Sequence, residues 1–304
     1  MKPYVTLFVG VLSVSFAAIF IRLADAPPLV IATYRMAIAS IILIPIASIK
    51  SKKSLNKLSK NNILLILLSS VFVALHFGLW ITSLSYTSIA SSVVLVTVHP
   101  AFVAVISYFL WGERVNKLAI GGIVVAFAGV IFVNYSGFTF GSPAILGNLL
   151  ALIAGFAMGA YLIIGRQLRA RIDILSYLAI LYTCSAIILL IATLSFGYNL
   201  FSYSNTTYLM MILLALVPQI IGHSTLNLAV RLIPVIFVSV AILGEPVGAT
   251  LLGYFILGEV PTANEITGGL LILVGIFLVM RQKPRIEGRS QRMVLGKQTF
   301  LTSY

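Results

Sequence analysis

Residues 108–113 read YFLWGE, and residues 254–259 read YFILGE. The two stretches are 146 positions apart, and the same offset relates Pro100 to Pro246. Chance similarity between two apolar runs would not preserve proline, glycine and glutamate at one spacing, so the second half of the chain repeats the first. Further matches at this offset are Gly122 with Gly268, Gly129 with Gly275, and residues 41–43 with residues 187–189.

The composition indicates a membrane protein. Of the 304 residues, 60% are hydrophobic and 9% are charged, whereas a soluble domain carries about 25% charged residues. The apolar runs are long and apolar on all sides, which favours helices over the alternating strands of a barrel. About 20 apolar residues span a bilayer, and ten segments qualify: 4–22, 28–49, 62–84, 88–111, 116–134, 145–165, 174–195, 207–230, 234–257 and 262–280.

The predicted fold is therefore an all-α membrane protein with ten transmembrane helices in two inverted repeats. Each repeat holds five spans, and because five is odd, the second copy enters the membrane upside down. We expect one repeat at 1–137, a second at 144–281, and a basic cytosolic tail at 282–304. Inverted repeats are the architecture of many secondary transporters, whose substrate site lies near the bilayer midplane between the halves.

Lysine and arginine set the orientation. With the N-terminus in the cytoplasm, every one of the 20 Lys and Arg residues except Arg22 and Arg35 falls at the cytoplasmic side. The two outer loops at 135–144 and 196–206 carry no charge. The positive-inside rule then predicts that both termini face the cytoplasm. It also accounts for the net charge of +13 without a nucleic-acid partner.

Two polar stripes interrupt the apolar spans. His76 and Trp80 are four residues apart, and so are Gln219, His223 and Asn227 on the eighth span, so each set shares a helix face. Because polar groups avoid lipid, we expect both stripes to face inward and bind an organic solute. The alternative is interhelical hydrogen bonding without a ligand.

Glu245 and His99 are repeat partners, and each precedes a proline. A proline removes a backbone N–H, so we expect the ninth span to bend at Pro246. A charge at mid-membrane costs about 2.5–3.5 kcal/mol on insertion scales, which makes Glu245 a candidate proton carrier that His99 assists. The alternative is that Glu245 is a buried acid bonded to a neighbouring helix, and that His99 donates to a carbonyl freed by Pro100.

Three further charged residues lie within or at the ends of predicted spans. Arg35 lies one turn into the second span, where it could extend to the outer interface, pair with Asp25 or meet an anionic group; we expect pairing, or a part in coupling or gating. Glu113 and Glu259 end repeat-related helices, and we expect them to be structural or gating groups.

No enzyme motif stands out. The sequence lacks His-Glu-x-x-His, Gly-x-Ser-x-Gly and a phosphate loop, so no cofactor, metal or ATP-driven step is predicted. The expected partners are a small-molecule substrate and the lipid bilayer, with proton coupling as an option, in a monomer or weak dimer. Two alternatives stay open: an intramembrane lipid-modifying enzyme and a passive channel or facilitator.

The chain resembles the EamA-type family of the drug/metabolite transporter superfamily up to about residue 281. The resemblance implies ten helices, cytoplasmic termini, a place in the cell membrane, and secondary transport of small metabolites, often export. Amino-acid-like, nucleoside-like and drug-like solutes all fall within it. The residues that carry it are 88–92 with 100–102, 112–114, Gly121, Gly122 and Gly129, their second copy at 245–246, 258–259, 268–269 and Gly275, and 16–20, 26–28 and 34–35 in the opening helices.

Overall fold

The structure is a computed structural model that describes residues 3–55, 58–87, 92, 95–97, 99–111, 116–133, 142–169, 172–258, 260 and 263–281. Within these residues the chain is helical and contains no strand. Seven helical stretches are long and apolar enough to cross a membrane, and two shorter apolar helices cover 117–132 and 266–279. Of the ten expected spans, only 88–111 lies largely outside these stretches, and several of its residues fall outside the described chain.

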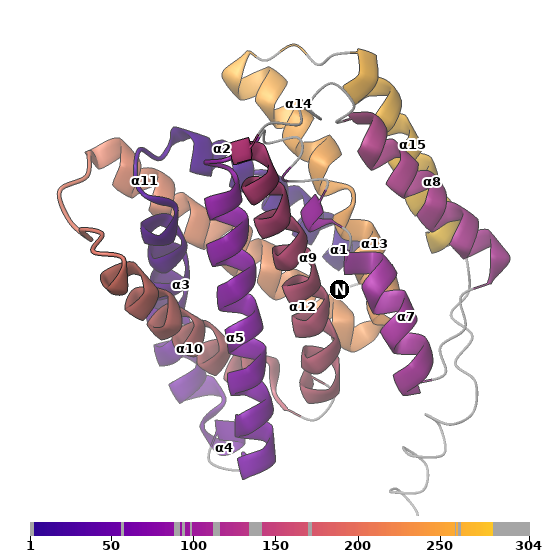
Figure 1. The fold of residues 1–304 in the computed structure, drawn as a ribbon. Helices are drawn as coiled ribbons and strands as arrows, with labels where there is room; N and C mark the ends of the chain where they lie inside the picture. Colours follow the sequence, from indigo (N-terminus) through magenta and orange to yellow (C-terminus); the bar gives the residue numbers. More distant parts are fainter. Residues whose placement is uncertain are drawn as a thin grey trace, which may run out of the picture.

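The helices follow the expected segments closely (Figure 1). In the first half they are α1 (Pro3–Ser15), α2 (Ala17–Leu23), α3 (Pro28–Lys50), α4 (Lys52–Leu55), α5 (Lys60–Ser83), α7 (His99–Trp111) and α8 (Lys117–Val133). In the second half they are α9 (Ser142–Arg169), α10 (Ile174–Ser195), α11 (Asn205–Leu214), the π-helix η2 (Ala215–His223), α12 (Ser224–Leu232), α13 (Val235–Ile242), α14 (Glu245–Leu257) and α15 (Ala263–Met280).

Helices of the two halves pair with one another. The most extensive contacts join α8 to α15, α5 to α9 and α3 to α10. In Figure 1 the α3–α10 pair and the α8–α15 pair lie on opposite sides of the bundle. Hydrogen bonds between hydroxyl groups join α3 to α10 at Thr33–Thr193 (2.8 Å) and Ser40–Thr183 (2.7 Å).

Glycines bring α8 and α15 into backbone contact. A Cβ added to Gly122 would lie 2.8 Å from the backbone oxygen of Gly275, and one added to Gly129 would lie 2.6 Å from that of Gly268. At the 146-residue offset, Gly122 corresponds to Gly268, and Gly129 corresponds to Gly275. The contact of Gly122 with Gly275 and the contact of Gly129 with Gly268 are therefore equivalent under the repeat. Such reciprocity is what a two-fold axis between repeat-related helices produces.

Three spans depart from regular α-helix near the middle of the bundle. The first is interrupted at Phe16, between α1 and α2. The eighth contains the π-helix η2 around Pro218, an uncommon conformation that occurs mostly at functional sites. The ninth breaks at Leu243 and Gly244, between α13 and α14.

The expected bend at Pro246 was misplaced. Pro246 lies in the first turn of α14, directly after the break. Backbone N–H groups in the first turn have no intrahelical partner, so proline is tolerated there. As a consequence, Glu245 is the first residue of a new helix rather than a residue within a kinked one. Glu113 and Glu259 lie outside the described residues.

Candidate functional site

A cavity lies in the middle of the bundle between the two halves. Its wall includes residues of α1, α2, α3, α5, α7, α9, η2, α12, α13 and α14. The polar or aromatic side chains of the wall are Arg35, His76, Trp80, Thr97, His99, His223 and Glu245. The cavity leaves about 30 Å³ for the centres of water molecules, which is room for water but not for an organic solute.

The wall of the cavity repeats itself at the offset found in the sequence. Trp80 pairs with Leu226, and Val96 pairs with Ile242, each at a spacing of 146 residues. The two groups flanking the helix breaks, His99 and Glu245, form a third such pair. Repeat-related positions therefore meet around one cavity.

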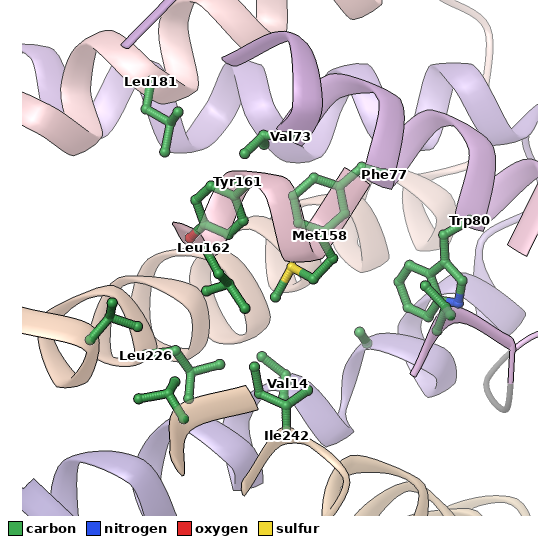
Figure 2. Packing of buried hydrophobic residues seen from close by; sticks show 14 of the residues in the cluster. Val14, Val73, Phe77, Trp80, Met158, Tyr161, Leu162, Leu181, Leu226 and Ile242 are labelled. Atoms are coloured by element: carbon green, nitrogen blue, oxygen red, sulfur yellow. The ribbon is translucent and has the colours of Figure 1, made fainter. Parts of the chain in front are cut away.

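Apolar side chains form most of the remaining surface. In Figure 2, Val14, Leu226 and Ile242 point toward one another below Met158 and Phe77. These residues come from α1, α12, α13, α9 and α5. The few polar groups are thus set in an apolar wall, which is the usual makeup of a small-molecule site.

Arg35 is the most buried charged side chain of the site, with 0% of its surface exposed. Its Nε donates a hydrogen bond of 2.7 Å to Oε1 of Gln219. The guanidinium carbon lies 4.0 Å from the centre of the Phe77 ring. The two terminal nitrogens, Nη1 and Nη2, have no hydrogen-bond partner within the described part of the chain.

The expectation for Arg35 therefore needs correcting. Arg35 neither extends to the outer interface nor pairs with Asp25; it lines the central cavity and is held by Gln219. The sequence alone could not indicate this contact, because Gln219 follows Arg35 by 184 residues. Gln219 lies within the π-helix η2, which hydropathy does not reveal either.

His76 and Trp80 occupy the same wall and contact each other. Their rings stack with 6.1 Å between centroids and an interplanar angle of 10°. Nδ1 of His76 forms a hydrogen bond of 3.1 Å with the backbone oxygen of Ala154 on α9. The indole Nε1 of Trp80 has no partner among the described residues.

The three residues of the stripe on the eighth span differ in position: one lines the cavity, and two lie behind the lining residues. His223 lines the cavity and meets Phe77 edge to face, with 5.1 Å between ring centroids. Gln219 and Asn227 are buried but lie behind the lining. Nδ2 of Asn227 donates 2.7 Å to the backbone oxygen of His223, one turn earlier.

Glu245 and His99 begin α14 and α7 and face the same cavity. Nδ1 of His99 lies 3.2 Å from the backbone oxygen of Val96, the carbonyl that Pro100 leaves without its helical partner. The carboxylate of Glu245 makes no hydrogen bond in the described structure, and its electrostatic partner is Arg35. Among the described residues of the site, Arg35 and Glu245 are thus a cation and a carboxylate that are not joined by an ion pair.

Phe77 and Met158 belong to the site and were missed in the sequence. Met158 lines the cavity, and Phe77 contacts both Arg35 and His223. A signal for Phe77 existed, because it is the repeat partner of His223 at the 146-residue offset. Nothing in the sequence distinguishes Met158 from other apolar residues of its span.

Comparison with known proteins identifies the family. A model of the EamA-like transporter family matches residues 1–135 and again residues 145–281. The chain belongs to this family. Membership of the EamA family also places it in the drug/metabolite transporter superfamily.

Relatives of this EamA-family chain carry transporter names. It is 25% identical over 271 residues to a protein of Archaeoglobus fulgidus named "Uncharacterized transporter", covering 87% of this chain and 91% of the relative. It is 26% identical over 291 residues to the "Uncharacterized transporter YoaV" of Bacillus subtilis, covering 90% and 96%. A solved structure, described as a crystal structure of protein, superposes with a TM-score of 0.79 at 18% identity, over 94% of this chain and 99% of the other. That likeness shows a shared fold.

Proposed function

We propose that this EamA-family protein is a secondary transporter that exports a small organic metabolite across the cytoplasmic membrane by alternating access. The observation that carries the proposal is the central cavity, whose wall pairs Trp80 with Leu226 and His99 with Glu245 at the repeat offset. A site between two repeat-related halves can open to either side when the halves rock against each other.

The small volume of the cavity fits an occluded state of such a cycle. An organic solute needs a site of about 300–1,000 Å³, so binding requires the surrounding helices to separate. The breaks at Phe16 and at Leu243–Gly244 lie beside the cavity residues Ala17, Ile242 and Glu245. Interrupted helices are the elements that transporters use around a midplane site.

Energy for uphill transport would come from a proton gradient. The sequence carries no nucleotide-binding motif, and Glu245 faces the cavity from the start of α14. In this proposal Glu245 binds a proton while the site is open to one side and releases it to the other, and His99 at most assists. The rival reading is facilitated diffusion, with Glu245 serving only to secure α14.

The two other function classes fit the cavity less well. An intramembrane enzyme would need reactive groups gathered near one membrane interface, whereas the polar residues here surround a cavity in the middle of the bundle, beside the helix breaks. A channel would need a continuous polar path, whereas Val14, Leu226 and Ile242 form an apolar wall. Saturable flux distinguishes a transporter from both alternatives.

The test begins with purified protein screened against metabolites by thermal shift, because a ligand of the native state raises its apparent stability. Ligands that stabilise the protein are then loaded into proteoliposomes, and their flux is measured with and without a pH gradient. We expect saturable flux that the gradient accelerates in wild type but not in Glu245→Gln, which keeps the shape of the side chain and cannot titrate. Flux of no stabilising ligand would overturn the transporter proposal, and equal responses in both proteins would overturn proton coupling.

A further inference from the structure

The guanidinium of Arg35 is held in place, but only part of its hydrogen-bonding capacity is used. Gln219 accepts from its Nε and Phe77 covers one face, while Nη1 and Nη2 stay without a partner within the described residues. A guanidinium has five N–H donors in a rigid fork. Burying unpaired donors of a charged group is costly, so a fully buried arginine that lines a cavity and has both terminal nitrogens unpaired within the described residues points to an anionic ligand.

The fork has the geometry of a carboxylate receptor. Two parallel N–H donors match the two oxygens of a planar carboxylate, and such paired bonds are about twice as strong as neutral ones. The cavity wall also contains two side chains that suit an apolar body. They are Trp80, whose ring stacks on His76, and Leu226. Once the surrounding helices separate, a flat apolar group can pack against these side chains while its carboxylate reaches Arg35.

The carboxylate of Glu245 also interacts electrostatically with Arg35. It would therefore compete with the carboxylate of a bound solute. It faces the cavity but makes no ion pair with Arg35 in this structure, so the fork is free for another group. An ionised Glu245 repels an incoming anion, and a neutral one does not. The other titratable groups facing this region are His76 on α5, His99 on α7, His223 on η2 and Tyr182 on α10.

We propose that the transported solute is an organic anion with an aromatic or apolar body, that Arg35 binds its carboxylate, and that a proton on Glu245 is required for that anion to load. The inference rests on the proposed transport function and names its substrate class. It also gives the coupling a physical origin and a sign: anion and proton cross in the same direction, because the cavity accepts one negative charge opposite Arg35 and not two. An imposed pH gradient should therefore drive this solute toward the more alkaline side, and export from a more alkaline cytoplasm runs on the gradient of the solute itself.

Binding can be tested without knowing the natural solute. The probes are phenylacetate and phenylacetamide, which have the same shape and differ in charge at one group, together with the cation phenethylamine. We expect phenylacetate alone to raise the melting temperature of the detergent-purified protein. Arg35→Gln should weaken phenylacetate binding roughly tenfold or more, since a hydrogen bond to a charged group contributes about 1.5–3 kcal/mol. Arg281→Gln, at the exposed end of α15, is the charge-matched control and should bind as wild type does.

The role of Glu245 is read from the pH dependence of binding. Between about pH 8 and pH 6 the probe stays ionised, so a change in affinity reports on the protein. We expect wild type to bind phenylacetate more tightly at the lower pH, and Glu245→Gln to bind tightly at both. Arg35→Lys should fall between wild type and Arg35→Gln, because an ammonium keeps the charge and lacks the fork; it also serves if Arg35→Gln proves unstable.

Each result decides the inference. Equal stabilisation by the acid and the amide, no stabilisation by phenylacetate, or wild-type binding in both Arg35 variants would overturn the anion site. A pH response that survives in Glu245→Gln would overturn the proton requirement. Anion binding without flux of any solute would instead overturn the transport function and leave the Arg35 anion site standing. Saturable flux of a neutral or cationic solute, with no anion binding, would overturn the anion site and leave the transport function standing.

Discussion

Trp80 contributes to the site through its ring. It lies in the cavity wall against His76 and is 4% exposed. We expect Trp80→Leu to lower affinity for an aryl ligand such as phenylacetate about fivefold, because an aromatic pair contributes about 0.5–1.5 kcal/mol beyond the area it buries. Trp80→Phe retains a ring and should keep most of the affinity. Titration by thermal shift checks both variants, and equal affinities for Leu and Phe would contradict the stacking role.

Single residues also show where reading the sequence succeeded and where it failed. His76, Trp80 and His223 stand at helical spacing in apolar spans, and that pattern was enough to select them as inward-facing. The place of Arg35 depends on a contact with Gln219, far along the chain and on a π-helix. No local pattern predicts a contact of that kind, because the direction of the Gln219 side chain is set by tertiary packing and by irregular helix geometry.

Among the elements, α8 and α15 depend on glycine for their close approach. A Cβ at Gly129 would meet the backbone of Gly268 and Ile272 within 2.7 Å, whereas one at Gly121 would meet nothing within 4 Å. We expect Gly129→Ala to destabilise the protein by about 1–3 kcal/mol, the usual cost of overpacking. Gly121→Ala should be neutral or slightly stabilising, because alanine is the better helix former. Thermal unfolding in detergent compares them, and equal melting temperatures would mean that the helices do not pack as described.

Asp173 secures the start of α10 and ties it to α3. Its carboxylate accepts hydrogen bonds from the hydroxyl of Ser51 (2.5 Å) and from the backbone N–H groups of Leu175 (3.1 Å) and Ser176 (3.2 Å). Partial burial acts to raise the pKa of Asp173, but these hydrogen bonds, with Arg231 nearby, hold that pKa below its ordinary value. The ionised form is therefore the one that stabilises the fold.

The acid stability of the protein should change when Asp173 is replaced. Because the pKa is lowered on folding, the contribution of Asp173 is fully present above the ordinary carboxyl value of about 4 and is lost as the pH falls through the folded-state pKa. We expect Asp173→Ala to lose about 1 kcal/mol at neutral pH. Asp173→Asn keeps a good N-cap and should lose less stability at neutral pH than Asp173→Ala. Neither variant has an ionisable group at this position, so both should lose less stability than wild type as the pH falls below about 4. Melting curves at neutral and acidic pH test this, and parallel curves for all three proteins would exclude the role.

At the scale of the whole molecule, we expect both termini and the 50–60 segment to face the cytoplasm. The basis is the distribution of lysine and arginine, which leaves loops 135–144 and 196–206 uncharged. In a Cys184→Ser background, an impermeant thiol reagent added to intact cells should label Ser142→Cys and Asn205→Cys but not Ser54→Cys. Labelling at position 54 from outside would mean that the protein has the opposite orientation in the membrane.

The architecture was more predictable than its details. Hydropathy gave the positions of most helices to within a few residues, because the bilayer imposes one length on every span; of the expected span 88–111, the structure describes a helix at 99–111. The 146-residue offset was visible in the sequence, and the reciprocal glycine contacts of α8 and α15 follow it. The break at Phe16 was not predicted, because hydropathy reports burial in lipid and not the continuity of backbone hydrogen bonds. The bend expected at Pro246 lies instead at Leu243–Gly244, just before it.

The position of Trp80 gives the protein an optical reporter of its own. The chain has two tryptophans, and the other is Trp111, the last residue of α7. In a Trp111→Phe variant, all indole fluorescence would come from a ring inside the cavity. Indole emission shifts toward longer wavelengths when water reaches the ring. The colour of the light that this variant emits would therefore report how often the cavity is open and wet, with no dye attached.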